Sequence, residues 1–326
     1  PHISNGYDFS IMASEMLGEL NVSHTGCRFY PNGNALSTAE LGALYDESYK
    51  GAGVRLNEIL PGGPLDTHSD IKAGDIITAI DGQTIEAGED FLPLLAGKAG
   101  VLTRLTLKGH KEDVVIRPIS AQKQMTLLYR RWVRRNTEMV DSLSEGRLAY
   151  VHIQAMNGES FHELYRTLLS DKNRQKEAAI VDTRHNGGGW LHNDVCELLS
   201  GKRSIKYMPR GQYIGDDPFN RWVKPSCMLI CEDNYSNAHG TPWLYHELGI
   251  GKLVGAPVPG TMTAVWWESI GDYVFGIPQV GSMDNRGQLL ENQQLEPDIK
   301  CFLTPDNLLQ GKDAQIEQAV KLLLNK

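Results

Sequence analysis

The residue of this chain best suited to nucleophilic chemistry is a serine that follows a short apolar run. Ser236 comes shortly after residues 226–230, which are typical of a buried strand, and precedes a segment near Thr241 that is typical of a helix. A strand that enters a helix through a sharp turn exposes a serine hydroxyl and leaves backbone N–H groups free to bind an oxyanion. The alternative is structural, because serine is also a favoured residue for capping a helix.

Groups that could activate such a serine lie far from it in the sequence. His24 directly follows Ser23 after a helix-like apolar stretch, and Glu291 follows a glycine turn near the other end of the chain. Between them, an apolar run at 178–181 leads into three consecutive glycines at 187–189. Catalytic partners are commonly distant in sequence and adjacent in space. Taken alone, His24 is also typical of an exposed histidine, Glu291 of a solvated carboxylate, and the three glycines of an ordinary loop.

Taken together, these groups belong to motifs that resemble the C-terminal half of the tricorn protease family, relatives of the tail-specific, C-terminal-processing serine peptidases. The motifs follow the order of the family over nearly the whole chain, which makes the resemblance specific. They are Gly18-Glu19-Leu20-Asn21-Val22-Ser23-His24, Asp182-Thr183-Arg184-His185-Asn186-Gly187-Gly188-Gly189, Tyr235-Ser236-Asn237-Ala238, Gly249-Ile250-Gly251-Lys252-Leu253-Val254-Gly255, and Glu291-Asn292 with Pro297-Asp298.

The resemblance implies a catalytic tetrad. Ser236 would be the nucleophile and His24 the general base that accepts its proton, while Ser23 and Glu291 would orient and polarise the imidazole. The oxyanion would be bound by the backbone N–H of Asn237 and by one N–H of the glycine run, Gly187, Gly188 or Gly189. Glycine suits that run because the chain must approach the substrate closely. We expect no cofactor and no metal.

One branch of the superfamily uses a serine–lysine dyad instead, with the lysine one strand after the helix of the nucleophile. The corresponding stretch here, 256–264, contains no lysine, and the nearest one, Lys252, precedes it in a glycine-rich connection. Without a lysine base Ser236 needs His24, which favours the tetrad. Two alternatives stay open: a Ser-Lys tail-specific peptidase that uses another lysine, and a non-catalytic PDZ-type peptide-binding module with a decayed active site.

A unit that resembles a PDZ domain lies between His24 and the peptidase motifs. An alternating run at 53–60, a second strand closed by Asp81-Gly82, a short helix at 91–95 and a hairpin at 103–116 predict a mainly-β domain. The run Ala73-Gly74-Asp75-Ile76-Ile77 is a specific marker of the PDZ family. Such domains bind extended peptides by adding them as a strand to a sheet edge.

The remaining chain alternates between strands and helices. Segments at 148–153, 158–171 and 178–181 read as strand, helix and strand, which predicts a right-handed crossover and a parallel sheet. The resemblance implies an α/β catalytic core, a crotonase/ClpP-like mixed sheet with helices, joined to a mainly-β PDZ domain and a short N-terminal helical remnant. The expected domains are the helical remnant with Ser23 and His24 at 1–38, the PDZ-like domain at 39–120 and the α/β serine peptidase core at 121–326.

Composition restricts the partners. The chain has 32 Lys and Arg against 40 Asp and Glu, a net charge of −8 and a pI near 5.7, which argues against nucleic acid despite four arginines within 130–135. No apolar run approaches the roughly 20 residues that span a bilayer. The expected substrate is a peptide or an unfolded protein. The resemblance also implies a homo-oligomer, and an N-terminal β-propeller region that is missing from this sequence.

Substrate preference is predicted less directly. Tricorn-type enzymes are thought to prefer basic side chains through an acidic residue whose position here corresponds to Met208, which is apolar. Asp216 and Asp217, shortly downstream, are the alternative acidic groups for such a substrate-binding pocket. A tryptophan pair, Trp266 and Trp267, together with Trp243, suits either the cleft or the core, and core packing is the favoured interpretation.

The five cysteines show no spacing typical of a metal site. Cys227 and Cys231 are four residues apart, but no histidine or second cysteine pair nearby completes a zinc site, so buried free thiols are expected. The sequence leaves the compartment open between a bacterial cytoplasm and periplasm, because any export signal would precede Pro1.

Overall fold

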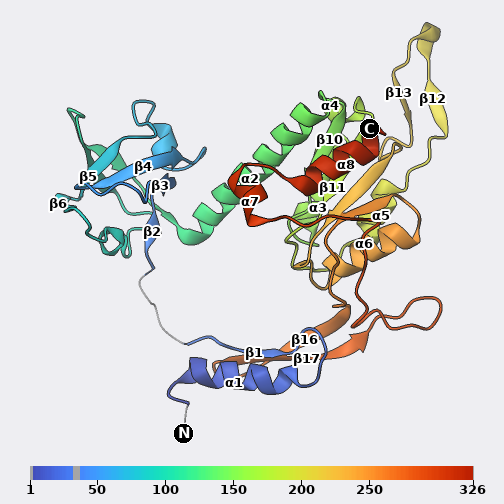
Figure 1. The fold of residues 1–326 in the computed structure, drawn as a ribbon, viewed down its shortest axis with the longest axis horizontal. Coiled ribbons are helices and arrows are strands. Elements are labelled where there is room, and N and C mark those ends of the chain that lie inside the picture. The colour runs from blue at the N-terminus through green and yellow to red at the C-terminus, as the bar shows by residue number, and fades with distance from the viewer. Residues whose placement is uncertain (1–2, 32–36, 326) are drawn as a thin grey trace. The chain divides into compact units, whose positions relative to one another are not determined.

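The computed structural model describes residues 3–31 and 37–325, which form two compact units (Figure 1). One unit combines the segment up to residue 32 with Asn136–Lys326, and the other is Gly33–Arg135. Helix α2 (Ala121–Leu143) contributes residues to both units. The predicted boundaries at 38 and 120 stay a prediction. The N-terminal segment, however, clusters with the peptidase core rather than standing alone.

The first unit is built on a five-stranded sheet in the order β10-β11-β14-β15-β18, and every pairing in it is parallel. All residues of its first three strands are buried, as expected for a parallel sheet covered on both faces. The predicted crossover and parallel sheet are therefore confirmed. The strands are β10 (Leu148–His152), β11 (Ala178–Asp182), β14 (Ser226–Ile230), β15 (Lys252–Gly255) and β18 (Ile299–Lys300).

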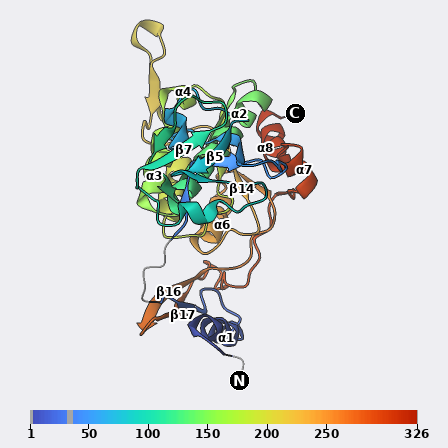
Figure 2. The ribbon, with the colours of Figure 1, turned by 90° about the vertical axis from the view of Figure 1, so that its left-hand side faces the viewer.

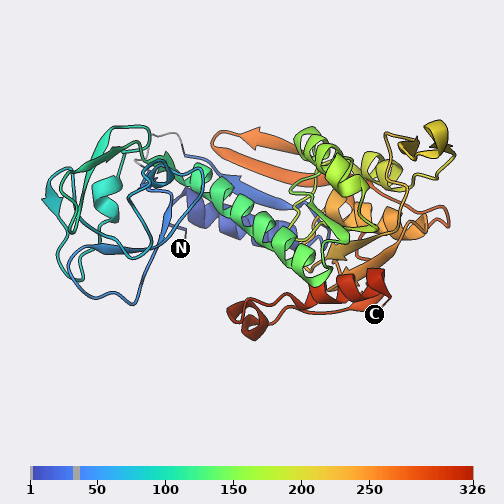
Figure 3. The same cartoon turned by 90° about the horizontal axis from the view of Figure 1, so that it is seen from above.

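Helices cover both faces of this sheet. Alternate strand residues such as Val151 and Val181 pack with α3, α5 and α6, whereas α8 contacts β14 and β15 from the other side (Figure 3). The predicted helix at 158–171 is divided in two, because Ser170 caps a new short helix. The helices are α3 (Gly158–Leu168), α4 (Asp171–Arg174), α5 (His192–Leu199), α6 (Asn237–Glu247), α7 (Pro305–Leu309) and α8 (Ala314–Leu324).

A second layer in the same unit joins the two ends of the sequence. Strands β1 (Gly26–Phe29), β17 (Tyr273–Gly281) and β16 (Thr263–Ile270) form an antiparallel sheet in that order. Helix α1 (Gly6–Gly18), capped by the Asn5 side chain, packs on β1, and two views show it along the β16–β17 hairpin (Figures 1 and 2). The loop from α1 to β1 carries Ser23 and His24, so this layer positions both residues.

A two-stranded hairpin completes the first unit. It consists of β12 (Ile205–Tyr207) and β13 (Gly215–Asp217), joined through the short 3-10 helix η3 (Pro209–Gly211), and it projects from the body of the unit (Figures 1 and 2). No helix in the described ranges is long and apolar enough to cross a membrane.

The second unit is the mainly-β domain expected between 39 and 120. Its sheet has the order β3-β4-β5-β7-β8, with β6 on β5, and the Asp81-Gly82 turn has both residues at positive φ, as expected for a tight hairpin. The segment at 91–95 forms a 3-10 helix around Pro93. The elements are β2 (Ala39–Glu40), β3 (Ala43–Tyr45), β4 (Val54–Ile59), η1 (Leu65–Thr67), β5 (Ile76–Ile80), β6 (Gln83–Thr84), η2 (Leu92–Leu95), β7 (Thr103–Leu107), β8 (Val114–Ile116) and β9 (Ile119–Ser120).

The arginine-rich run at 130–135 lies on α2 and is used for ion pairs. The Arg131 guanidinium donates two hydrogen bonds to the Glu58 carboxylate, at 2.6 and 2.5 Å, and Arg135 adds a third at 3.2 Å. These contacts lower the pKa of Glu58, chiefly through the hydrogen bond from Arg131. Two arginines of this run are therefore engaged in ion pairs with Glu58.

Candidate active site

Ser236 stands on a sharp turn between β14 and α6. Its backbone has φ 59° and ψ −126°, a conformation that costs a non-glycine residue about 1–3 kcal/mol and is concentrated at functional sites. Ser236 occupies the N-cap position of α6, yet its side chain makes no capping hydrogen bond. The capping interpretation is therefore wrong. The backbone N–H of Ser236 donates to Thr261 Oγ1 at 2.9 Å, which holds the turn.

Glu291, Ser23 and His24 lie in one hydrogen-bonded chain. The Ser23 hydroxyl donates to Glu291 Oε2 at 3.0 Å, and the Ser23 backbone N–H donates to the other carboxylate oxygen. The same hydroxyl lies 3.0 Å from His24 Nδ1. A serine thus connects the carboxylate to the imidazole, although 268 positions separate Ser23 from Glu291 in the sequence.

Thr263 is a fourth member of this hydrogen-bonded group, and the sequence analysis did not identify it. Its hydroxyl lies 2.9 Å from His24 Nδ1 and 2.7 Å from Ser23 Oγ, and it donates to the Ser23 carbonyl oxygen at 3.2 Å. Ser23 donates its hydroxyl proton to Glu291, and Thr263 directs its own to an oxygen of Ser23, so the Thr263 oxygen accepts from Nδ1–H. We therefore assign the proton to Nδ1, which leaves Nε2 free to act as a base. Thr263 is the first residue of β16 and lies within the stretch 256–264, which was of interest in the sequence only because it contains no lysine.

Two links connect the imidazole to the nucleophile turn. The backbone N–H of His24 donates to the Tyr235 hydroxyl at 2.6 Å, and the centroids of the His24 and Tyr235 rings lie 4.8 Å apart. The second link is the segment from Thr261 to Thr263, which binds Ser236 at one end and His24 at the other. In the part of the chain that the structure describes, no direct hydrogen bond joins Ser236 Oγ to His24, as is common before substrate binds.

The glycine run lies against the nucleophile. A Cβ added at Gly188 would lie 2.7 Å from Ser236 Cβ and 3.1 Å from the nitrogen of Asn237, so only glycine fits there. The Gly188 N–H donates to Asn186 Oδ1 at 2.9 Å and is therefore already engaged. The N–H groups that stay available for an oxyanion are those of Asn237, Gly187 and Gly189, for which the described hydrogen bonds include no acceptor.

Two asparagines fasten this run to the nucleophile turn. The Asn186 carbonyl accepts the Tyr235 N–H at 3.0 Å, and its side chain donates to the Ile153 carbonyl at 2.7 Å. The buried Asn237 side chain accepts from the N–H groups of Leu191 at 2.7 Å and His192 at 3.1 Å. The turn and the glycine run are therefore held as one rigid assembly, as an oxyanion site requires.

A buried ion-pair network supports the start of the glycine run. Arg184 is 1% exposed, and its guanidinium donates to Asp182 at 2.7 Å, Asp313 at 2.8 Å and Gln315 at 2.9 Å. Burial alone would raise the pKa of Asp182, but the Arg184 charge outweighs burial and lowers it. The network ties the end of β11 to helix α8.

Burial sets the charge state of the candidate base. Loss of hydration lowers the pKa of His24 below its ordinary value of 6.5, and the Glu291 charge offsets part of that effect. His24 is therefore neutral near pH 7, the form in which an imidazole accepts a proton. A cysteine nucleophile beside Ser236 is disfavoured, because burial raises the pKa of the Cys231 thiol to about 12.

Lys252 does not reach the nucleophile. Its ammonium group is exposed and lies 2.7 Å from Asp298 Oδ1, at the start of β15. Lys252 pairs with Cys227 at the start of β14, the end opposite to the Ser236 turn, so it is not the base of a Ser-Lys dyad.

The residues predicted to bind substrate lie on the β12–β13 hairpin. Met208 is exposed, Asp217 accepts from the Tyr207 hydroxyl at 2.6 Å, and the buried Asp216 pairs with Arg203 at 2.8 Å. Among the described residues, none of the three shares a hydrogen bond or ion pair with the tetrad. Asp216 already has a cationic partner, which weakens its use as a receptor for a basic substrate side chain.

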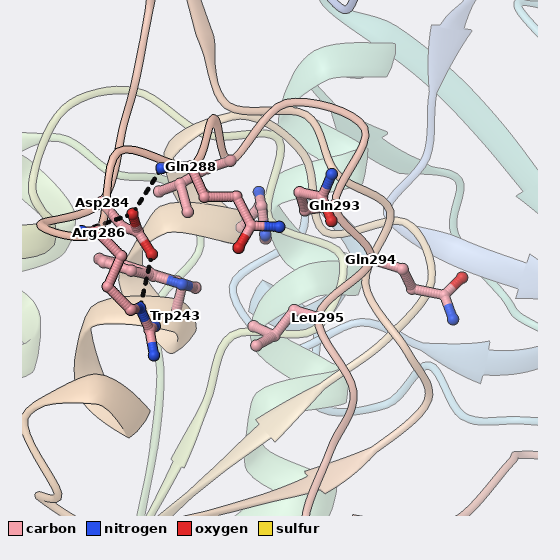
Figure 4. A pocket seen from close by; sticks show the side chains of 9 residues that line it. Trp243, Asp284, Arg286, Gln288, Gln293, Gln294 and Leu295 are labelled. Carbon is pink, nitrogen blue, oxygen red and sulfur yellow. Dashed lines mark hydrogen bonds and ion pairs between the residues drawn. The ribbon is translucent and has the colours of Figure 1, made fainter.

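A cavity of about 200 Å³ is lined by residues of helix α6 and of the segment 284–295 (Figure 4). Trp243 of α6 lines it together with Leu295 and the amides of Gln288 and Gln293. Neither Ser236 nor His24 is among the residues that line it, so it does not hold the scissile bond.

The prediction that the tryptophans pack in the core is wrong for Trp266 and Trp267. Trp266 is 60% exposed and Trp267 is 37% exposed.

Two family models match the chain. The model described as "Peptidase family S41" matches residues 147–301, and "Tricorn protease PDZ domain" matches residues 42–121. The first covers the parallel sheet, Ser236 and Glu291, and the second covers the mainly-β unit.

Known proteins match over the whole chain. The tricorn protease of Thermoplasma acidophilum is 27% identical over 100% of this chain and 31% of its own length, and a tricorn protease homolog of Saccharolobus solfataricus is 28% identical over 99% and 31%. The crystal structure of the tricorn protease superposes with a TM-score of 0.88 at 25% identity, over 99% of this chain and 33% of that chain. The chain thus spans about a third of the length of these relatives. Residues 147–301 thus match the S41 peptidase family and residues 42–121 match the tricorn protease PDZ domain, and together with these relatives they indicate a tricorn-like serine peptidase.

Proposed function

We propose that this chain cleaves peptides or unfolded protein segments through an acyl-enzyme on Ser236, with His24 as general base and Ser23 and Glu291 as the groups that orient it. The observation that carries the proposal is the convergence of Glu291, Ser23 and His24 on the turn that presents Ser236. Residues far apart in the sequence meet there, and a carboxylate, a serine and an imidazole in one hydrogen-bonded chain support the activation of a serine nucleophile.

The proposed reaction begins with proton transfer. His24 Nε2 accepts the proton of the Ser236 hydroxyl as Oγ attacks the carbonyl carbon of the peptide bond, which forms a tetrahedral oxyanion. The imidazolium then donates this proton to the leaving amine, and the C–N bond breaks. A water molecule, deprotonated by His24, hydrolyses the ester and restores Ser236. In the substrate-bound site Nε2 and Oγ would have to come into hydrogen-bond contact.

The charges that form on the imidazole and on the substrate oxygen during the reaction explain the roles of the other groups. The imidazolium is stabilised by the Glu291 carboxylate through the Ser23 hydroxyl, and the Nδ1–H bond to Thr263 keeps the ring in one orientation. The oxyanion would be bound by the Asn237 N–H and by the N–H of Gly187 or Gly189. One such donor typically contributes about 3 kcal/mol to transition-state stabilisation.

Covalent labelling tests the proposal directly. A fluorophosphonate should modify Ser236, and His24→Ala should lower the labelling rate by at least about 10³-fold, whereas Lys252→Met should leave it unchanged. Labelling that survives His24→Ala would support the Ser-Lys alternative, with a lysine other than Lys252 as the base. A folded protein that takes up no label would support the non-catalytic peptide-binding alternative.

Substrate preference and assembly belong to the same proposal. Because Asp216 is paired with Arg203, we expect little preference for Lys or Arg beside the cut, and a peptide library tests this. Strong selection for basic side chains would restore the acidic-pocket hypothesis for Asp216 and Asp217.

We also propose a homo-oligomer and a partner β-propeller region, by analogy with the longer relatives. Sedimentation of the chain with and without that region measures both.

A further inference from the structure

A second cluster of reactive side chains lies beside the nucleophile turn. His185, Cys231 and Asp233 offer a nitrogen, a sulfur and a carboxylate oxygen that all lie within 4.8 Å of one another. His185 follows β11, and Cys231 and Asp233 follow β14, the adjacent parallel strand. The carboxyl ends of neighbouring parallel strands are a common location for ligand sites in α/β folds.

From this geometry we propose that His185, Cys231 and Asp233 form a zinc site with an open fourth position. A tetrahedral zinc with ordinary bond lengths sets its N, O and S ligands about 3.3–3.6 Å apart. Here Cys231 Sγ lies 3.9 Å from His185 Nδ1 and 3.3 Å from Asp233 Oδ1, and His185 Nδ1 lies 2.7 Å from Asp233 Oδ2. Side-chain adjustments of about half an ångström would seat the ion, and water would complete the tetrahedron.

The donor types select the cation. A thiolate and an imidazole favour zinc over magnesium or calcium, which prefer oxygen ligands. The same three residues do not form a catalytic relay, because Asp233 and Cys231 both approach the same nitrogen of His185. Binding would displace the Cys231 proton, as for other zinc–cysteine sites.

The surrounding backbone supports the ligands. The His185 N–H donates to Cys231 Sγ at 3.2 Å, a contact that would persist to a bound thiolate. Asn234 Oδ1 accepts the Cys231 N–H at 3.1 Å, and its amide nitrogen donates to Thr183 Oγ1 at 3.0 Å. Such outer contacts orient metal ligands and commonly change affinity by about 10- to 100-fold. Zinc would therefore tie together the two segments that lead to Gly187 and to Ser236.

Zinc binding to the intact chain tests the inference without any peptidase assay. Zn²⁺ should be withdrawn from a chromogenic chelator at one ion per chain, and Cd²⁺ should give a thiolate charge-transfer absorbance. His185→Asn, which suits the φ of 62° at this position, and Asp233→Asn should each weaken binding at least about tenfold. Cys231→Ser should remove the cadmium absorbance.

The controls are a cysteine and a histidine elsewhere in the chain. Cys301→Ser and His246→Asn should leave the zinc affinity and the cadmium absorbance unchanged. His185 and Asp233 are exposed, so their variants should fold even if Cys231→Ser, whose side chain is buried, does not. No zinc withdrawn by the wild-type chain, or equal binding by all three ligand variants, would overturn the inference.

Discussion

The Tyr235 hydroxyl accepts the backbone N–H of His24 at 2.6 Å, across 211 positions of sequence. The residue directly before the candidate nucleophile therefore holds the backbone of the candidate base. His24 itself has a φ of 64°, so its loop follows a path that few residues adopt without such support. Together with the pairing of β1 and β17, this bond holds the N-terminal segment beside the Ser236 turn.

The closeness of Gly188 to Ser236 predicts that alanine is not tolerated there. A methyl group would lie 2.7 Å from Ser236 Cβ at a φ of 97°, so the turn and the oxyanion donors must shift. We expect Gly188→Ala to lower the rate of fluorophosphonate labelling about 10²-fold or more while the protein stays folded. Gly158→Ala, at a position with open space and ordinary φ, is the matched control and should label like the wild type. Equal rates for the two variants would contradict the proposed geometry.

Thr263 predicts a smaller effect that depends on its hydroxyl. Thr263→Val keeps the shape but removes the acceptor for Nδ1–H of His24, and a hydrogen bond of this kind contributes about 0.5–1.5 kcal/mol. The labelling rate should fall roughly three- to tenfold. Thr263→Ser should restore most of it, whereas a loss common to both variants would indicate a packing role.

The pH dependence of labelling should reflect His24. The protonated imidazole cannot accept the Ser236 proton, and because burial lowers the pKa of His24, the acidic limb should fall below pH 6.5. The Glu291 charge raises that pKa, so Glu291→Gln should move the limb to still lower pH while reducing the plateau rate. Glu268→Gln, on the exposed part of β16, is the control. A limb that moves to higher pH in Glu291→Gln would show that another group titrates.

Arg184 predicts a change in stability. Arg184→Met would leave Asp182 and Asp313 buried without their cation, and loss of one partner of a buried ion pair typically costs about 3–5 kcal/mol. Urea unfolding should register that loss in the free energy of unfolding. Arg166→Met removes an exposed ion pair within one helix and should leave the unfolding curve unchanged. A wild-type unfolding curve for Arg184→Met would mean that the carboxylates find other partners.

Strands and their order were readable from the sequence wherever local pattern and burial agree. The runs at 148–151, 178–181 and 227–230 are continuously apolar because both faces of the sheet are covered, and the strand–helix–strand order left one handedness of crossover. The PDZ hairpins were equally readable, since Asp81-Gly82 is a turn signal with a known geometry.

The tetrad came from motif resemblance, but its supporting contacts did not. Thr261 precedes β16 and Thr263 begins it, and only tertiary packing makes one a partner of Ser236 and the other a partner of His24. Likewise, His185 and Cys231 are 46 positions apart, so they do not show the close spacing by which metal ligands are recognised in a sequence. Contacts between adjacent parallel strands leave no periodic signal in the chain.

The attachment of β1 has a consequence for heat inactivation. This strand is the edge of its sheet, paired with β17 over four residues and packed by α1 and by Trp267 on Arg28, whereas the parallel sheet is covered on both faces. Lightly held edges detach at lower free energy than the body of a domain. Warming should therefore withdraw the imidazole while the sheet is still intact, and cooling should return it, so that thermal silencing precedes melting and is reversible.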